Sequence, residues 1–497
     1  MFKLLLKFVR WFLSFKKRTL LIVLQNNNEL RSGGGFITQV LEITMGKFSF
    51  KKRKLDVFEN LKTAEAEKAS GKMKKLLKIQ AIQFRDCNTE LKFSENAKKM
   101  IKLYRQNFSA KNVAMVVAVN FSFIEDLLGV LGKVMGYTKK NLFYKLSVDV
   151  SNIDLHSEIA RNVRKTVITR LFNKLLFRAG LFFWKWRAMN KLLNKAVENR
   201  DMQFYFVDGI RPIKSLLNDV KFENGDYVAI VDNNYLGVKT NRYLQRRVNR
   251  KVMVLTDERG NIKQANVNLE IELFNANKFN YPLNGVYQSV TNIYVPYDEE
   301  NFEIENKLLP GESKLITINY VLDKNYFENE YVFKYIKQPG VKNEFFSDTI
   351  IFPLNKALSA DNKKVVIREN TALLDPTQIE KDLRYKILLE ENCNEPRIYF
   401  HELIDKQTIE IRFNEPVKFT EKISRMALKS MSGDKYEITE IEKIQNGRIY
   451  KLKVPGLPSE KKAFYSLELE GVINYAGVAY NGSGKKVTVV YKSDMLK

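Results

Sequence analysis

Apolar and polar positions in the first half of the chain change between the spacing of strands and that of helices. Residues 19–60 predict two strands on either side of a polar stretch, and the unbroken apolar run VAMVVAVNF at 113–121 predicts a buried strand. Helical spacing occurs at 62–80, 93–108, 122–134 and 157–197, and short strands are expected at 202–207 and 226–232. Strands that alternate with helices indicate an α/β core with a mixed sheet, which we place at residues 19–242.

From residue 243 onward the pattern changes to a period of two. Gly, Pro and Asn residues separate the apolar runs, and almost no helical spacing remains. This pattern is typical of a β-sandwich, which we expect at 243–360. It pauses at 361–394, interpreted as a linker, and resumes at 395–497. The predicted architecture is therefore an α/β domain followed by two all-β sandwich domains.

The opening segment, MFKLLLKFVRWFLSFKKR at residues 1–18, carries six basic residues, no acid, and Leu, Phe and Trp at helical spacing. Such a basic amphipathic segment is typical of a helix that lies on an anionic membrane surface. A degenerate signal peptide, a helix packed on the domain and the remnant of a longer anchored segment are the alternatives. No apolar run reaches the roughly eighteen residues of a membrane span.

The net charge of +26 favours a polyanionic partner such as nucleic acid, anionic lipid or phosphate-bearing glycopolymer. A proteome that is rich in lysine throughout would explain the same charge. No recognisable motif for reading nucleic acid accompanies it, so we expect no nucleic acid as partner. Two cysteines and two histidines exclude a disulfide scaffold and a zinc ribbon. Any chemistry must therefore use carboxylates, amides, arginines and a hard cation.

The stretch QNNNELRSGGG at residues 25–35 concentrates hydrogen-bonding side chains and glycines between two apolar runs. It is longer than a tight hairpin requires, so we expect a long loop. The amide of Asn27, the guanidinium of Arg31 and the backbone N–H groups at Gly33 and Gly34 are suited to binding phosphate. The alternative is an Asn- and Gly-rich loop whose amides satisfy neighbouring backbone groups.

A second basic constellation occupies the long predicted helix. Between Glu158 and Glu198 there are ten basic residues and no acid. Arg161 and Arg164 lie three positions apart on one helix face, where two guanidinium groups can converge on one pyrophosphate. The alternative is a helix that packs on the core and turns a solvated basic face outward.

Several segments together resemble a bacterial family of unknown function, DUF4012. They occur in the order of the family over residues 19–355. The chain departs from the family at Ser32 and Gly33, where Pro-Thr is usual, and near Asn112, where Asp-Gly-Val is usual. The resemblance implies a shared fold and no particular activity. It rests on LLIVLQNNNELRSGGGFITQVLEITMGKF (20–48), FRDCN (84–88), ENRDMQFYF (198–206), GDYVAIVDNNYLGVKTNRY (225–243), YQSVTNIYVP (287–296) and YIKQPG (335–340).

The order of the parts is also similar to that of the LytR-CpsA-Psr phosphotransferases, whose Leu-Gly-Gly-Val segment is echoed by FIEDLLGVLGKV at 123–134. That similarity implies an enzyme that takes a polyprenyl-pyrophosphate-linked glycan and passes it to the cell wall. The chain departs from that pattern at its duplicated magnesium-binding aspartates. The resemblance implies that Arg31, Glu29 and Asp86 are catalytic, that Arg31, Arg161 and Arg164 neutralise the pyrophosphate, and that Glu29 and Asp86 hold Mg²⁺.

The last unit, which contains KQTIEIRFNEPVKF at 406–419, resembles bacterial Ig-like domains. Such domains are spacers and adhesion units, so we expect an extracytoplasmic location at a membrane or the cell surface. Two functions follow. The first is an envelope protein that binds a lipid-linked glycopolymer and transfers it to the cell wall. The second is a non-catalytic surface protein whose α/β head is a degenerate ligand-binding module.

Overall fold

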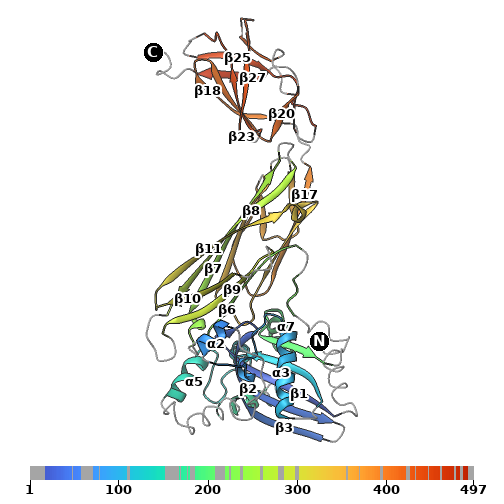
Figure 1. Ribbon diagram of the computed structural model, residues 1–497, viewed down its shortest axis with the longest axis vertical. Coiled ribbons are helices and arrows are strands. Elements are labelled where there is room, and N and C mark those ends of the chain that lie inside the picture. Colours follow the sequence, from blue (N-terminus) through green and yellow to red (C-terminus); the bar gives the residue numbers. More distant parts are fainter. Residues whose placement is uncertain are drawn as a thin grey trace.

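The computed structural model contains three units along the chain: a head, a β-sandwich and a C-terminal β unit (Figure 1). The structure describes residues 17–46, 49–57, 71–77, 79–108, 112–151, 167, 170–175, 177–178, 185–207, 219–222, 225–235, 239–257, 261–277, 285–296, 302–353, 356–368, 370–391, 396–420, 426–430, 432–445, 447–458, 462–474, 477–481 and 485–490.

The head, residues 17–222, is built on a five-stranded mixed sheet in the order β3-β2-β1-β4-β5. β1 runs parallel to β4, and the other neighbours are antiparallel. All eight residues of β4 are buried because the strand is flanked by strands on both sides and covered on both faces. The strands are β1 (Arg18–Arg31), β2 (Gly34–Gly46), β3 (Ser49–Asp56), β4 (Val113–Asn120) and β5 (Met202–Phe206).

Helices cover both faces of this sheet. α3 (Phe93–Asn107), α2 (Gly71–Leu77) and η1 (Phe84–Asp86) pack on the face to which Leu21 and Val23 of β1 point. α4 (Phe121–Leu131), α5 (Leu142–Ser151) and α7 (Trp186–Glu198) pack on the other face, with Leu20 and Leu24. The head is therefore a mixed sheet between two helical layers, because successive residues of β1 point to opposite faces.

The β-sandwich, residues 225–391, consists of two six-stranded sheets in the orders β10-β9-β6-β12-β17-β14 and β11-β8-β7-β13-β16-β15. Buried and more exposed residues alternate along most of β7, as a sheet with one face in the core requires. The elements are β6 (Asp226–Asn233), η4 (Thr240–Arg242), β7 (Leu244–Thr256), β8 (Ile262–Asn275), β9 (Tyr287–Tyr294), β10 (Phe302–Leu308), β11 (Ser313–Asp323), η5 (Lys324–Phe327), β12 (Glu330–Ile336), β13 (Glu344–Ile351), β14 (Lys356–Ala360), β15 (Val365–Arg368), β16 (Thr371–Gln378) and β17 (Leu383–Glu391).

The limits of the sandwich differ from the expected ones at two places. β6 was expected in the α/β domain at 19–242 but pairs with β9 and β12. Residues 361–394, expected as a linker, contain β15, β16 and β17. β17 pairs with β12 and β14 inside the sandwich. The linker interpretation failed because these strands are short or rich in exposed charges, and their partners lie earlier in the chain.

The C-terminal β unit contains two four-stranded antiparallel sheets, β18-β19-β24-β23 and β22-β21-β25-β27, and the pair β20-β26. They enclose one core with Phe413, Leu428 and Leu467. The prediction of β-domains after the head is confirmed at this level. The strands are β18 (Ile398–Asp405), β19 (Thr408–Phe413), β20 (Val417–Phe419), β21 (Ala427–Ser430), β22 (Lys435–Glu437), β23 (Glu440–Gln445), β24 (Ile449–Lys453), β25 (Lys462–Glu468), β26 (Val472–Asn474) and β27 (Lys485–Val490).

Of the opening segment 1–18, residues 1–16 lie outside the described residues. Lys17 precedes β1, and Arg18 is its first residue. None of the helices in the described part of the chain combines the length and the apolar character that crossing a bilayer requires.

Candidate functional site

The stretch expected as a long loop forms the end of a β-hairpin. β1 continues to Arg31 and β2 begins at Gly34, which leaves a turn of two residues. The register shifts after Asn26, so that residues 27–29 bulge out of the ladder. The loop prediction was wrong because a bulge and a strand end have the same polar composition as a loop.

The glycines of this hairpin are needed for close packing. A Cβ atom on Gly35 would lie 2.3 Å from the carbonyl carbon of Asn26 in the bulge. Gly34 has a φ of +132°, and a Cβ atom there would lie 2.5 Å from a buried glutamine side-chain oxygen. On Gly33 it would lie 2.0 Å from Asn88 Oδ1. Gly33 and Gly34, which were expected to bind phosphate, therefore lie in a closed contact.

The end of the hairpin is hydrogen-bonded to the β-sandwich, and we call this contact the joint. Asn27 donates from Nδ2 to the carbonyl of Gly340 at 2.9 Å. Both the N–H and the hydroxyl of Ser32 donate to Asn233 Oδ1 at 2.9 Å. The joint consists of residues 27–32 of the head and of Asp232, Asn233, Asn234, Asn241, Gln338 and Gly340 of the sandwich.

Backbone groups of the hairpin complete the joint. The N–H of Asn234 donates to the carbonyl of Leu30 at 3.0 Å, and the N–H of Leu30 donates to Asn241 Oδ1 at 3.2 Å. Gln338 donates from Nε2 to the carbonyl of Arg31 at 3.1 Å. Buried polar groups of the head are thus satisfied by the sandwich, which ties the two units together.

Arg31, expected to bind phosphate, is only 1% exposed. Its guanidinium donates to the carbonyl of Asn234 and lies 3.3 Å from Glu29 Oε1. The rings of Phe36 and Tyr235 lie 5.3 and 5.2 Å from it. Arg31 therefore acts in this structure as an arginine of the joint, and Glu29 is its ion-pair partner.

Asp86 lies close to the same arginine. Burial raises the pKa of Asp86, although the charges of Arg85 and Arg31 lower it. Arg85 Nε lies 3.3 Å from Asp86 Oδ2. The described residues include no group of three or more His, Cys, Asp or Glu side chains that could hold a metal ion. Because Glu29 and Asp86 each face a guanidinium, this pair of carboxylates does not fit a magnesium ion.

The structure thus brings together five of the expected site residues and sets Asp86 beside them. These residues form a structural contact between the head and the sandwich. The remaining two expected site residues, Arg161 and Arg164, lie outside the described residues. The five are Asn27, Glu29, Arg31, Gly33 and Gly34.

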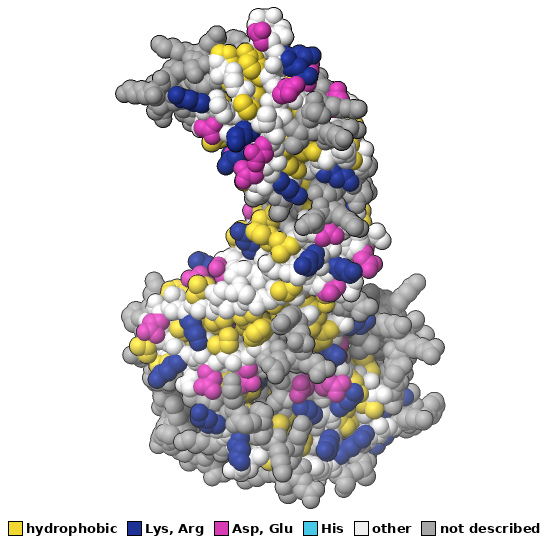
Figure 2. Space-filling view, turned by 45° about the horizontal axis from the view of Figure 1, so that its top comes forward, with side chains coloured by type: hydrophobic (Ala, Val, Ile, Leu, Met, Phe, Trp, Pro, Cys, Tyr) yellow, Lys and Arg dark blue, Asp and Glu magenta, His cyan; other side chains and the backbone are white. Residues whose placement is uncertain are grey.

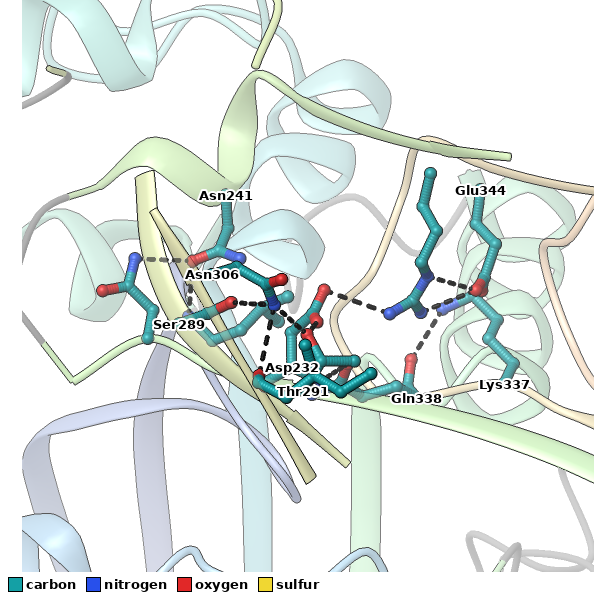
Figure 3. A network of polar contacts seen from close by, with 12 residues as sticks. Asp232, Asn241, Ser289, Thr291, Asn306, Lys337, Gln338 and Glu344 are labelled. Atoms are coloured by element: carbon teal, nitrogen blue, oxygen red, sulfur yellow. Dashed lines mark hydrogen bonds and ion pairs between the residues drawn. The ribbon is translucent and has the colours of Figure 1, made fainter. Parts of the chain in front are cut away.

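A chain of buried polar side chains continues from the joint into the sandwich (Figure 3). Gln338 Oε1 accepts the N–H of Asp232 at 2.9 Å, and the hydroxyl of Thr291 donates to Asp232 Oδ1. Asn306 donates to Thr291 Oγ1 at 2.7 Å. Lys337 donates from Nζ to the carbonyl of Gln338 at 3.1 Å. Burial lowers the pKa of Lys337 to about 8, against the opposite effect of nearby carboxylates.

Two arginines of β7 lie in the core of the sandwich between carboxylates. Arg246 lies 3.0 Å from Asp232 and 2.6 Å from Glu344. Arg250 lies four residues further along β7, on the same inward-facing side of the strand. It pairs with Asp226 and with Asp348.

The tyrosine Tyr331 also accepts a hydrogen bond from Arg250, at 2.7 Å. Burial raises the pKa of Asp226 to about 6, although the charge of Arg250 lowers it. These ion pairs are buried in the core of the sandwich and are therefore not exposed to a ligand.

The head carries a basic groove that the sequence reasoning did not single out. Lys98, Lys102 and Arg105 of α3 line it together with Tyr205 and Val207 at the end of β5, around a volume of about 520 Å³. All three basic side chains are exposed, and Lys98 pairs with Glu95 on its own helix at 2.9 Å. The sequence contained a signal for this groove, because Lys98, Lys102 and Arg105 are four and three positions apart and therefore share one face of the helix.

Charge is divided unevenly between the units. Residues 1–222 contain 43 Lys and Arg against 18 Asp and Glu, a net charge of +25. Residues 223–497 contain 40 against 39, a net charge of +1. In the space-filling view, basic side chains are spread over the lower lobe with acidic side chains among them, and higher up basic and acidic side chains lie next to each other (Figure 2). Nearly all of the excess charge therefore belongs to residues 1–222, that is, to the head and the segment before it.

Residues 16–150 match the sequence family described as "Protein of unknown function (DUF4012)". The match confirms the resemblance over that part of the head, and its extension to residue 355 stays a prediction. No curated protein matches the chain. A similar solved structure is a two-domain M1 zinc metallopeptidase mutant bound to L-tryptophan, at 14% identity and a TM-score of 0.17. The likeness covers 35% of this chain and 48% of that one, and a score this low supports no inference about fold or activity.

Proposed function

We propose that the protein is a non-catalytic envelope protein whose basic head binds an anionic, phosphate-bearing surface. The observation that carries this proposal is the division of charge, +25 in residues 1–222 and +1 in the rest. A polyanion attracts the head, while the nearly neutral β-domains are not drawn to it. The β-domains then act as a spacer that extends from the surface.

The structure of the joint favours binding over catalysis. Arg31 and Glu29, the expected catalytic pair, satisfy each other and the backbone of the sandwich. A phosphate ligand would have to displace these contacts and enter a buried site. The transfer reaction of the LytR-CpsA-Psr pattern therefore has no support from this hairpin, whereas binding to phosphate groups can use the exposed lysines and arginines.

The partner we propose is the anionic surface of a membrane, in an extracytoplasmic setting. The groove on α3 offers three basic side chains and a tyrosine around one hollow. Phosphate groups of lipids suit this combination because lysine and arginine bind phosphate and tyrosine is favoured at membrane interfaces. The six basic residues of segment 1–18 would add to the attraction. Lipid-linked glycopolymers carry the same phosphate chemistry.

Co-sedimentation of the full chain with phosphatidylglycerol vesicles tests the proposal. Changing Lys98, Lys102 and Arg105 to Gln should weaken binding roughly 100-fold, since each basic residue near such a surface contributes about 1 kcal/mol. The matched control changes three exposed lysines of the sandwich, Lys251, Lys263 and Lys324, to Gln and should bind as the unchanged chain does.

Three outcomes would overturn the proposal or redirect it. Equal weakening by both triple variants would show that only total charge matters. Equal binding to neutral phosphatidylcholine vesicles would exclude an anionic partner. Binding to soluble polyphosphate that is stronger than binding to vesicles would assign the head to a phosphate polymer in place of a membrane. A further variant that lacks residues 1–16 measures the share of the opening segment.

A further inference from the structure

The four edges of the β-sandwich differ in how they are protected from pairing with another strand. β14 and β15 are short, with five and four residues. β10 places Glu303, Glu305 and Lys307 at its exposed positions. Short length and outward charges are the usual means by which proteins prevent edge strands from pairing. Three of the four edges therefore carry such protection.

The fourth edge, β11, is long, and the middle of the strand has no outward charge. It has eleven residues, SKLITINYVLD, without proline, and its exposed positions from Leu315 to Val321 are uncharged. Leu315 is 62% exposed and Val321 is 41% exposed. β11 pairs with β8 along one side over its whole length and forms the end of its sheet (Figure 1). A long, apolar edge strand of this kind is suited to adding a further strand.

We propose that β11 pairs antiparallel with β11 of a second copy of this chain, around a twofold axis at Ile318. In that register Leu315 of one copy lies opposite Val321 of the other, and Thr317 lies opposite Asn319. Ser313 lies opposite Asp323, so no like charges meet. The exposed positions are therefore complementary to themselves, which a twofold interface between identical copies requires.

A groove beside the strand supports the same register. Met253, Asn268, Asn319 and Val321 contribute to its lining, around a volume of about 500 Å³. Because Leu315 of the second copy lies opposite Val321, its side chain reaches this groove. The exposed leucine and the groove that receives it then occur twice in the dimer. The two sheets would join into one continuous sheet across the axis, and the dimer would present two basic heads.

The oligomeric state of the full chain tests the pairing. Sedimentation equilibrium should show a reversible dimer at about 100 μM, within the range of modest interfaces. Leu315→Lys should raise the dimer dissociation constant at least 10-fold. The matched control is Leu309→Lys, because Leu309 is 49% exposed in the turn before β11 and is not part of the strand. A chain that stays monomeric, or equal effects of the two variants, would overturn the proposal.

A cross-linking experiment tests the register itself. In a chain with Cys393→Ser, one sample carries Leu315→Cys and another carries Val321→Cys, and Cys87 is buried. Oxidation of the mixture should give a disulfide-linked dimer, because directly opposed residues of antiparallel strands are close enough for a disulfide. Each sample alone should give much less. Strong cross-linking of Leu315→Cys with itself would contradict the proposed axis at Ile318.

Discussion

Residues 1–222 and the rest of the chain hold similar numbers of basic residues, 43 and 40, but differ in the acids that oppose them, 18 and 39. In the sandwich this balance extends into the core, where Arg246 and Arg250 each lie between two carboxylates. In the head, the basic side chains of the α3 groove are exposed. The buried arginines of the sandwich thus serve the fold, whereas the basic side chains of the α3 groove are exposed to a partner.

Not every basic side chain of the head is exposed, because Arg31 in the joint and Arg200 before β5 are buried, as arginines are in the sandwich. Arg31 is paired with Glu29 and bonded to the sandwich backbone. The comparison therefore separates two uses of arginine, and burial distinguishes them better than the residue type does.

Removing a balanced core arginine should have the largest effect. Arg250→Met leaves Asp226 and Asp348 without their cation and should destabilise the sandwich by about 3 to 5 kcal/mol. Urea unfolding followed by circular dichroism measures the loss. Arg247→Met is the control on the same strand, because the Arg247 side chain is 62% exposed, and its effect should stay within about 0.5 kcal/mol. A small loss of stability for Arg250→Met would show that the core does not depend on the balance between this arginine and its two carboxylates.

Burial of the charged form of Lys337 costs free energy, and this cost should appear in the pH dependence of the free energy of unfolding. Its folded pKa is lowered to about 8 from 10.5, so the folded state binds fewer protons than the unfolded state between these values. The free energy of unfolding should therefore rise with pH in this window, by about 3 kcal/mol in total. Lys337→Met should lack this rise, whereas Lys324→Met, at an exposed lysine, should keep it. Parallel pH profiles for all three chains would contradict the lowered pKa.

Arg31 should behave as a structural residue. Arg31→Met removes the ion pair with Glu29 and a hydrogen bond to the sandwich, so a loss of about 2 to 3 kcal/mol is expected. Binding of the folded protein to phosphatidylglycerol vesicles should not change. Thermal unfolding and vesicle co-sedimentation are the two measurements. Unchanged stability together with weaker vesicle binding would restore the phosphate-binding role that the sequence indicated.

The smallest of the four effects is expected from a methyl group in the hairpin. Gly35→Ala places Cβ against the backbone of Asn26 and should cost about 1 to 3 kcal/mol through overpacking. Gly132→Ala provides the comparison, since Gly132 has a φ of +81° with no atom within 4 Å of the added Cβ. That change should cost about 1 kcal/mol from backbone strain alone. Equal losses would show that close packing in the joint is not the reason for Gly35.

Local patterns predicted much of the secondary structure but not its grouping. The apolar run at 113–121 is the central strand β4, and the segment at 93–108 is α3. The strand predicted at 226–232 exists as β6, although its hydrogen-bonding partners belong to the sandwich. Its assignment to the head was wrong because strand pairing depends on residues more than a hundred positions away, such as β12.

The candidate site shows the same limit at the level of side chains. The sequence indicated that Asn27, Glu29, Arg31 and the glycines form one constellation, and the structure places them together. It could not show that Gly340 and Asn233 would accept their hydrogen bonds. An amide or a guanidinium has the same bonding capacity toward a phosphate as toward a carbonyl, so spacing alone does not distinguish a ligand site from a joint.

What the sequence by itself determined is the set of properties that add along the chain: the strand and helix periods, the excess of positive charge in residues 1–222, and the turn to β-structure after residue 243. The tertiary structure alone decided which of the charged groups are exposed and which are paired. Arg31 and Arg105 are the same residue type in the same unit, yet one is 1% exposed and the other lines an open groove. Burial depends on distant segments meeting in space, and the cost of leaving a buried charge unpaired then dictates its partner.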